Sequence, residues 1–202
     1  MRRLTGNRRS FVHLTIAGAD DIPIDRISDL YLNLLSALRR YGDLDVPVRV
    51  DPRELIALVA SVKVKLAPGY LWDPVSQQIR AAVLETFGFA SRKLAQPALR
   101  CELIGAIQQV EGVAYVDVDA FGGVPQHKTA QGTRRLLTPD EISALVQAIL
   151  TPHAAQTQTF LASSTKDVPT GAAGYSQEVL IPAQLAVFSP AVPDTLILNQ
   201  IV

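Results

Sequence analysis

The spacing of apolar and polar residues predicts a strand, a helix, a second helix and a second strand between Leu55 and Asp119. The first strand is half-exposed, because polar side chains stand between its apolar residues, which are Leu58, Ala60, Val62, Val64 and Leu66. Asp73-Pro74 predicts an N-cap and first turn for a helix over about 74–87. Every fourth residue of that helix is apolar, namely Val75, Ile79, Val83 and Phe87.

A second apolar stripe follows at helical spacing and consists of Leu99, Leu103, Ile104, Ile107 and Val110. Gly112 stands where a left-handed residue would end this helix. Residues 113–121 then alternate again, which predicts a strand with Ala114, Val116, Val118 and Ala120 on its buried face. Tyr115, Asp117 and Asp119 would form an acidic outer face.

The preceding part of the chain predicts a strand-helix-strand unit over 11–51, after a basic arm or linker at 1–10. Phe11–Ala17 alternates like a strand. Asp25 can cap a helix that Gly42 ends, and its broad apolar face comprises Ile27, Leu30, Tyr31, Leu34, Leu35, Leu38 and Tyr41. Val46–Val50 forms a short strand before a break at Asp51-Pro52.

Beyond Gly122 the composition becomes loop-like, and we expect a loop-rich segment at 123–177 with one short helix at 139–150. For residues 178–202 the sequence predicts two extended apolar segments. The predicted fold class is therefore α+β: an open-faced α/β sandwich of one strand-helix-strand unit and one strand-helix-helix-strand unit at 52–122. Whether the two units share one sheet or form two small sheets stays open.

Composition narrows the function classes. The 202 residues include 19 basic and 19 acidic ones, so the balanced charge does not favour nucleic acid or an anionic membrane. The single Cys101 cannot form an internal disulfide. No apolar run approaches the ~20 residues that span a bilayer, and the start lacks the apolar region of a signal peptide. We expect a soluble protein without direct membrane insertion.

The residues that could carry chemistry are few. His13, His127 and His153 do not stand at ligand spacing to one another or to Cys101, so no metal, cofactor or catalytic site is predicted. Asp117 and Asp119 are the one tempting carboxylate pair, although the wet face of a strand explains them better. Two alternatives stay open: a small-ligand-binding α/β regulatory module, and a small α/β enzyme with its site around these two aspartates.

Two stretches and the last residues resemble a known family. "ALVASVKVKLAPGYLWDPVSQQIRAAVLETFGF", "LAQPALRCELIGAIQQVEGVAYVDVDAF" and the closing "PDTLILNQIV" resemble the C-terminal portion of the baseplate J-like proteins. The family's second helix commonly opens with a small hydroxyl residue before a Glu, then carries an Ile-Gln pair, an apolar residue and Gly-Val. The matching residues are Glu102, Ile107, Gln108, Val110, Gly112 and Val113, whereas Cys101 replaces the hydroxyl residue. The resemblance covers most of 11–122 and the last ten residues.

This resemblance implies a structural, non-enzymatic wedge subunit of a contractile phage tail or a related injection particle. Such a subunit would assemble in the bacterial cytoplasm and lie in the baseplate. It would join other wedge subunits, hub or spike proteins and sheath-proximal proteins in a sixfold hetero-oligomer, and couple the baseplate to sheath contraction. We expect its contacts in the segment 122–177 and the C-terminal strands, and the candidate contact residues are Tyr70, Trp72, Arg134, Arg135, Phe160 and Leu161.

Overall fold

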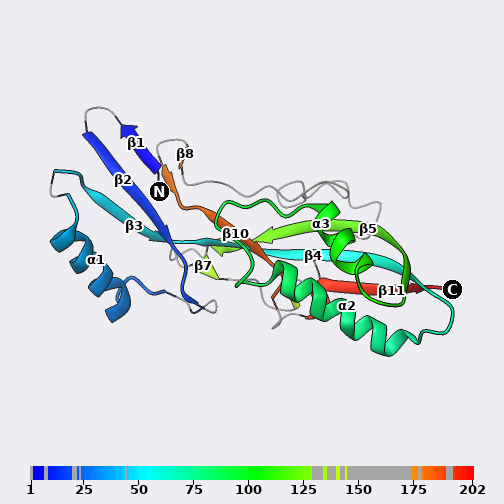
Figure 1. The fold of residues 1–202 in the computed structure, drawn as a ribbon. Helices are drawn as coiled ribbons and strands as arrows, with labels where there is room; N and C mark the ends of the chain where they lie inside the picture. The colour runs from blue at the N-terminus through cyan, green and yellow to red at the C-terminus, as the bar shows by residue number, and fades with distance from the viewer. Residues whose placement is uncertain are drawn as a thin grey trace.

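The computed structural model describes residues 2–6, 9–19, 22, 24–43, 45–128, 134–135, 140–141, 144, 174–176, 179–189 and 193–202. Two main sheets lie end to end along an elongated molecule (Figure 1). The first sheet and helix α1 occupy one end, and the second sheet carries helices α2 and α3 at the other. The α+β class predicted from the sequence is confirmed, and the two units build separate sheets.

The first sheet has the order β1-β2-β3. β1 (Arg2–Gly6) pairs antiparallel with β2 (Arg9–Ile16), and β2 pairs parallel with β3 (Val48–Pro52). Helix α1 (Asp29–Tyr41) connects the two parallel strands. Residues 2–6, expected within a basic arm, thus form a strand. The break expected at Asp51-Pro52 falls at Arg53 instead, because an edge strand pairs on one side only and tolerates a proline without an N–H.

The second sheet is arranged around β4 (Glu54–Leu66). β5 (Val113–Pro125) pairs antiparallel with one side of β4. Along the other side, β10 (Gln184–Val187) pairs parallel with residues 54–57 and β11 (Leu196–Ile201) pairs parallel with residues 60–65. The smaller elements are β6 (His127–Lys128) with β7 (Arg134–Arg135), β8 (Gly174–Ser176) with β9 (Val179–Ile181), and the 3-10 turn Pro193–Thr195.

Helices α2 (Trp72–Phe87) and α3 (Arg100–Gln108) cover one face of the second sheet and form the main core with it. The predicted α2 stripe is confirmed, since all four of its residues are buried. Leu103 and Ile107 of α3 are buried as well. Phe87 packs edge-on against the rings of Phe121 and Phe188, with ring centroids 6.3 and 5.8 Å apart. The core therefore joins both helices to strands that are distant in the sequence.

Three local expectations need correction. β4 is not half-exposed: residues 55–62 are buried on both faces, and only Lys63 and Lys65 are exposed. β5 runs on to Pro125 instead of ending in a loop at Gly122, and Ala114 is exposed. Helix α2 begins one residue before Asp73, so Asp73 lies in its first turn and does not cap it.

Gly112 adopts the left-handed conformation that the sequence predicts, with φ of +91°. It lies in the turn into β5, because α3 already ends at Gln108. At the start of α3, a Glu102 carboxylate oxygen accepts a hydrogen bond from the Leu99 N–H at 3.2 Å. Cys101 is exposed on this helix. The Glu therefore supplies half of a capping box, and the N-cap residue Leu99 has no side-chain oxygen to supply the other half.

Candidate functional site

Helix α1 begins at a capped turn. The Ser28 Oγ accepts a hydrogen bond from the Tyr31 N–H at 3.3 Å and is the N-cap. Asp25, the cap predicted from the sequence, instead accepts a hydrogen bond from the Ile27 N–H at 3.2 Å. Aspartate commonly binds the backbone two residues further on, so Asp25 shapes the turn before the helix. At the other end, the Gly42 N–H donates to the Leu38 carbonyl at 2.9 Å.

The broad apolar face of α1 is only partly buried. Tyr31 is buried, and Leu35 and Leu38 on the same stripe are half-buried. A neighbouring stripe, here called the outer stripe, consists of Leu30, Leu34, Ala37 and Tyr41. The exposed fraction is 60% for Leu30 and 78% for Tyr41. The helix therefore presents apolar side chains to the solvent along one line.

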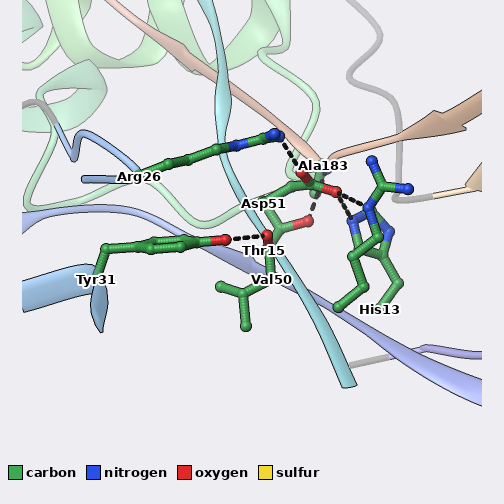
Figure 2. A network of polar contacts seen from close by, with 8 residues as sticks. His13, Thr15, Arg26, Tyr31, Val50, Asp51 and Ala183 are labelled. Carbon is green, nitrogen blue, oxygen red and sulfur yellow. Dashed lines mark hydrogen bonds and ion pairs between the residues drawn. The ribbon is translucent and has the colours of Figure 1, made fainter. Parts of the chain in front are cut away.

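A buried polar network fixes the turn before α1 to the first sheet (Figure 2). The Nε2 atom of His13 lies 2.9 Å from Oδ2 of Asp51. The Arg49 Nε lies 3.1 Å from the same oxygen, and Arg26 pairs with the other carboxylate oxygen. An ionised carboxylate only accepts hydrogen bonds, so Nε2 of His13 carries the hydrogen. One carboxylate thus joins β2, β3 and the turn before α1.

The burial of this network determines how much it contributes to the stability of the fold. The side chains of His13 and Asp51 are 0% and 5% exposed, whereas those of Arg26 and Arg49 are 60% and 57% exposed. A buried charge that loses one partner is strongly destabilised, so Asp51 holds its three neighbours in place. The Tyr31 hydroxyl adds a hydrogen bond to the Val50 carbonyl at 2.8 Å. Tyr31 of the buried stripe thereby ties helix α1 to β3, in addition to the Arg26 pair in the preceding turn.

The network lies where the two sheets meet. Arg53 alone separates β3 from β4, and its N–H donates to the Ile16 carbonyl at 2.8 Å. The Thr15 Oγ1 accepts a hydrogen bond from the Ala183 N–H at 3.0 Å, and the Ala183 carbonyl accepts one from the Glu54 N–H at 3.1 Å. These bonds connect the first sheet to the segment that leads into β10.

Tyr70 and Trp72, predicted as contact residues, flank the start of α2. Tyr70 is 42% exposed, and its hydroxyl donates to a Glu111 carboxylate oxygen at 2.8 Å. This hydrogen bond raises the pKa of the Tyr70 phenol above its ordinary value. Trp72 is half-buried and packs against the main core. Between them, Leu71 is 74% exposed.

The other four predicted contact residues fall in the segment after β5. Arg134 and Arg135 form β7, which pairs with β6. Phe160 and Leu161 lie outside the described residues, as does most of the helix predicted at 139–150. Within that helix, residues 140, 141 and 144 are helical. A role in partner contact stays a prediction for all six residues.

The aspartate pair on β5 does not form a carboxylate cluster. Asp119 accepts a hydrogen bond from the Lys63 Nζ at 2.9 Å, and Asp117 lies opposite Lys63 in the β4–β5 register. The hydrogen bond to Asp119 is the main cause of the raised pKa of Lys63. Among the described residues, no three His, Cys, Asp or Glu side chains gather as a metal site would require. The pair is therefore part of a surface ion-pair group.

Sequence reasoning missed the outer stripe and the His13–Asp51 pair. Three members of the stripe were included in a single broad apolar face and Ala37 was left out, although the four residues follow one another at intervals of four, three and four. The buried stripe of Tyr31, Leu35 and Leu38 has the same spacing, so spacing alone does not distinguish the two stripes. The His13–Asp51 pair has no signal in the sequence. The two residues are diagonal neighbours across β2 and β3, and this becomes apparent only once the register that pairs Thr15 with Asp51 is known.

Comparison with known proteins places the family resemblance on the first quarter of the chain. Residues 1–51 match the family model described as the baseplate J-like central domain. The match spans β1, β2, α1 and all of β3 except Pro52, and it includes both the buried network and the outer stripe. No curated protein matches the chain. In the part of the chain that the structure describes, no helix is long and apolar enough to span a bilayer.

Proposed function

We propose that this chain, which carries a baseplate J-like central domain in residues 1–51, is a wedge subunit of a contractile phage tail or a tail-like injection particle. The family is a structural one, and it supports a role in a phage-type baseplate. In this proposal the protein assembles with other wedge subunits and with hub or spike proteins around a sixfold axis. It couples the baseplate to sheath contraction.

The observation that carries the proposal is the match of residues 1–51, and the exposed outer stripe within this segment supports it. Contiguous apolar surface is costly on a free protein and commonly marks a contact site. The stripe belongs to a helix that is tied to the first sheet by the Arg26–Asp51 ion pair in the preceding turn and by the Tyr31–Val50 hydrogen bond. An apolar stripe on a helix anchored to a sheet suits a scaffold protein that must present a contact surface to its neighbours.

A second region supports assembly through strand edges. β5 extends over residues 113–125, and in the described part of the chain it pairs with β4 alone. An edge strand offers unpaired N–H and carbonyl groups to an extended segment of a partner. We place further contacts there, around Tyr70 and Trp72, and in the segment that contains Arg134 and Arg135.

The test is to purify the tagged protein from its native host under gentle conditions and to identify what accompanies it. Mass spectrometry should find sheath, tube and hub-like proteins, and negative-stain images should contain large particles. A matched strain that carries the tag on an unrelated cytoplasmic protein controls for nonspecific recovery. Recovery of the protein as a lone small species would contradict the proposal, as would a deletion strain that still makes particles with complete baseplates.

A further inference from the structure

We propose that Arg100 of α3 guards the outer edge of β5, because it occupies a backbone carbonyl at which a further strand would pair. In the free chain this contact keeps two copies from joining edge to edge. A strand of an assembly partner has to displace Arg100 before it can add along β5. This role rests on the proposed function, which places a partner contact at the same edge.

The pairing of β5 determines which of its backbone groups point outward. The Gln126 N–H donates to the Leu55 carbonyl at 2.9 Å, so this pair is bonded across the two strands. In antiparallel strands, bonded pairs alternate with pairs whose N–H and carbonyl groups point away from each other. The next pair, Ile56 with Pro125, therefore points away, and a proline without an N–H costs no ladder bond there. The same alternation along β4 turns its even-numbered residues away from β5, and their partners that point outward are Gly123, Phe121, Val118 and Val116.

Arg100 takes one of these outward carbonyls. It is the first residue of α3, and its Nη2 donates to the Val118 carbonyl at 2.6 Å. Val118 lies between two other outward positions, Val116 and Phe121. The register shift beside it leaves Asp119 as an extra residue in β5, and such a bulge increases the local twist. A strand that ran along the whole edge would meet an occupied carbonyl near its middle, next to a twisted segment.

The other two strands that pair with β4 have a similar arrangement. Arg80 of α2 donates from Nη1 to the Leu196 carbonyl of β11 at 3.0 Å. Ala95, in the segment between α2 and α3, donates its N–H to the Gln184 carbonyl of β10 at 2.8 Å. Ala95 has a φ of +61°, a backbone conformation that residues other than glycine adopt only at a cost. Each strand beside β4 thus gives one carbonyl to a donor from residues 72–108, and sheets commonly protect their edges with charged side chains and covering loops.

Without the guard, the edge of β5 is able to pair with its own copy. Antiparallel pairing about Val116 brings Tyr115 opposite Asp117 of the other copy, and Val113 opposite Asp119. No two aspartates then face each other, so like charges do not oppose this register. Self-association is therefore the readout that separates a guard from a residue that only ties α3 to the sheet.

Sedimentation velocity of the purified full chain tests the role of Arg100. Arg100→Met keeps a long side chain but removes its donors, so the Val118 carbonyl becomes available. This variant should form dimers or larger species at concentrations about tenfold or more below those at which the wild type does. Lys93→Met is the matched control. Lys93 is exposed in the segment between α2 and α3, so the same loss of a cation there should leave the protein as monomeric as the wild type.

Two further measurements locate the contact. Hydrogen exchange with mass spectrometry should find new protection of residues 113–125 in the associated Arg100→Met protein. A fluorescent peptide with the sequence of residues 113–125 should bind Arg100→Met about tenfold or more tightly than the wild type. The same peptide with methylated backbone nitrogens should not bind, because strand addition needs its N–H groups. Circular dichroism checks the fold, and Arg100→Gln, with a shorter uncharged side chain, is the second variant if Arg100→Met is unfolded.

Three results would overturn the guard role. They are equal self-association of the wild type and the Arg100 variant, association without protection of residues 113–125, and equal affinity of the two proteins for the peptide. Association of Lys93→Met to the same extent would also contradict it. All of these assays use the purified chain, so their failure is distinguishable from a failure to find the protein in a baseplate.

Discussion

A β-carbon on Gly112 would lie 2.4 Å from Cδ1 of Tyr70. The same glycine has a φ of +91°, where side chains other than hydrogen are strained. The turn between α3 and β5 therefore requires glycine for two separate reasons, one in the backbone and one in the packing of Tyr70.

Gly112→Ala should lower the free energy of unfolding by about 2 kcal/mol or more, because the backbone strain and the displaced Tyr70 ring both contribute. Gly69→Ala is the matched control. Gly69 has a φ of +90°, but a β-carbon there would meet nothing within 4 Å, so its loss should be about 1 kcal/mol. Urea unfolding measures both. Equal losses would mean that the Tyr70 ring moves aside without cost.

Val116→Asp should destabilise the protein by several kcal/mol, about 3 or more, because Val116 is 7% exposed and faces the main core. Its neighbour provides the control. Tyr115 is 53% exposed on the opposite face of β5, so Tyr115→Asp should cost about 1 kcal/mol or less. Thermal unfolding of the two variants should differ clearly, and similar melting temperatures would show that the two faces of β5 are assigned incorrectly.

Asp51→Ala should cost about 3 kcal/mol, because it leaves the buried His13 ring and two guanidinium groups without their shared carboxylate. Asp45→Ala removes an exposed carboxylate nearby and should change stability by less than about 0.5 kcal/mol. Chemical unfolding at neutral pH gives both values. A small effect of Asp51→Ala would mean that water replaces the carboxylate in this network.

The Tyr70–Glu111 hydrogen bond should make stability depend on alkaline pH. The bond raises the pKa of the Tyr70 phenol in the folded state above 10.0, so folding favours the protonated form. The stabilisation of the folded state by this bond is fully present below pH ~10 and is lost as the pH rises through the folded-state pKa of Tyr70. Tyr70→Phe should therefore lower the melting temperature at pH 8 and have a smaller effect at pH 11.

Lys63 also titrates at alkaline pH. Its pKa is raised in the folded state, so the stabilisation that its contact with Asp119 provides is also lost at high pH. The difference between wild type and Tyr70→Phe cancels the Lys63 effect, which both proteins share. A difference in melting temperature that stays constant from pH 8 to pH 11 would show that the hydrogen bond does not couple to stability.

The elements with the strongest local periodicity were predictable from the sequence. The α2 stripe recurs every fourth residue, and each of its members, from Val75 to Phe87, is buried where helical geometry places it. Val116 and Val118 likewise face the core as their alternation predicts. In these segments each residue's environment follows from its place on one helix or one strand, so no distant partner has to be known.

The errors occur where distant partners decide the outcome. Alternation in β4 indicated one solvent-exposed face, yet Val59 and Ser61 are buried on that side. Leu55 packs with Leu185 and Val187 of β10, and nothing in the residues around Leu55 points to that strand. The same holds for helix α1. Its sequence predicts a broad apolar face, but only the fold determines which stripe of that face the sheet covers.

The pairing of β4 also sets the order in which the chain can fold. The side chains of Glu54 and Gln184 meet across β4 and β10 although they are 130 residues apart in the sequence. At 5–20 residues per second, a ribosome needs roughly 10 s to make the intervening chain. During that interval one side of β4 has no partner strand from β10 or β11, and such long-range closure is slow. Completion of the second sheet is therefore a late event in synthesis, and the nascent chain carries a bare apolar strand edge until then.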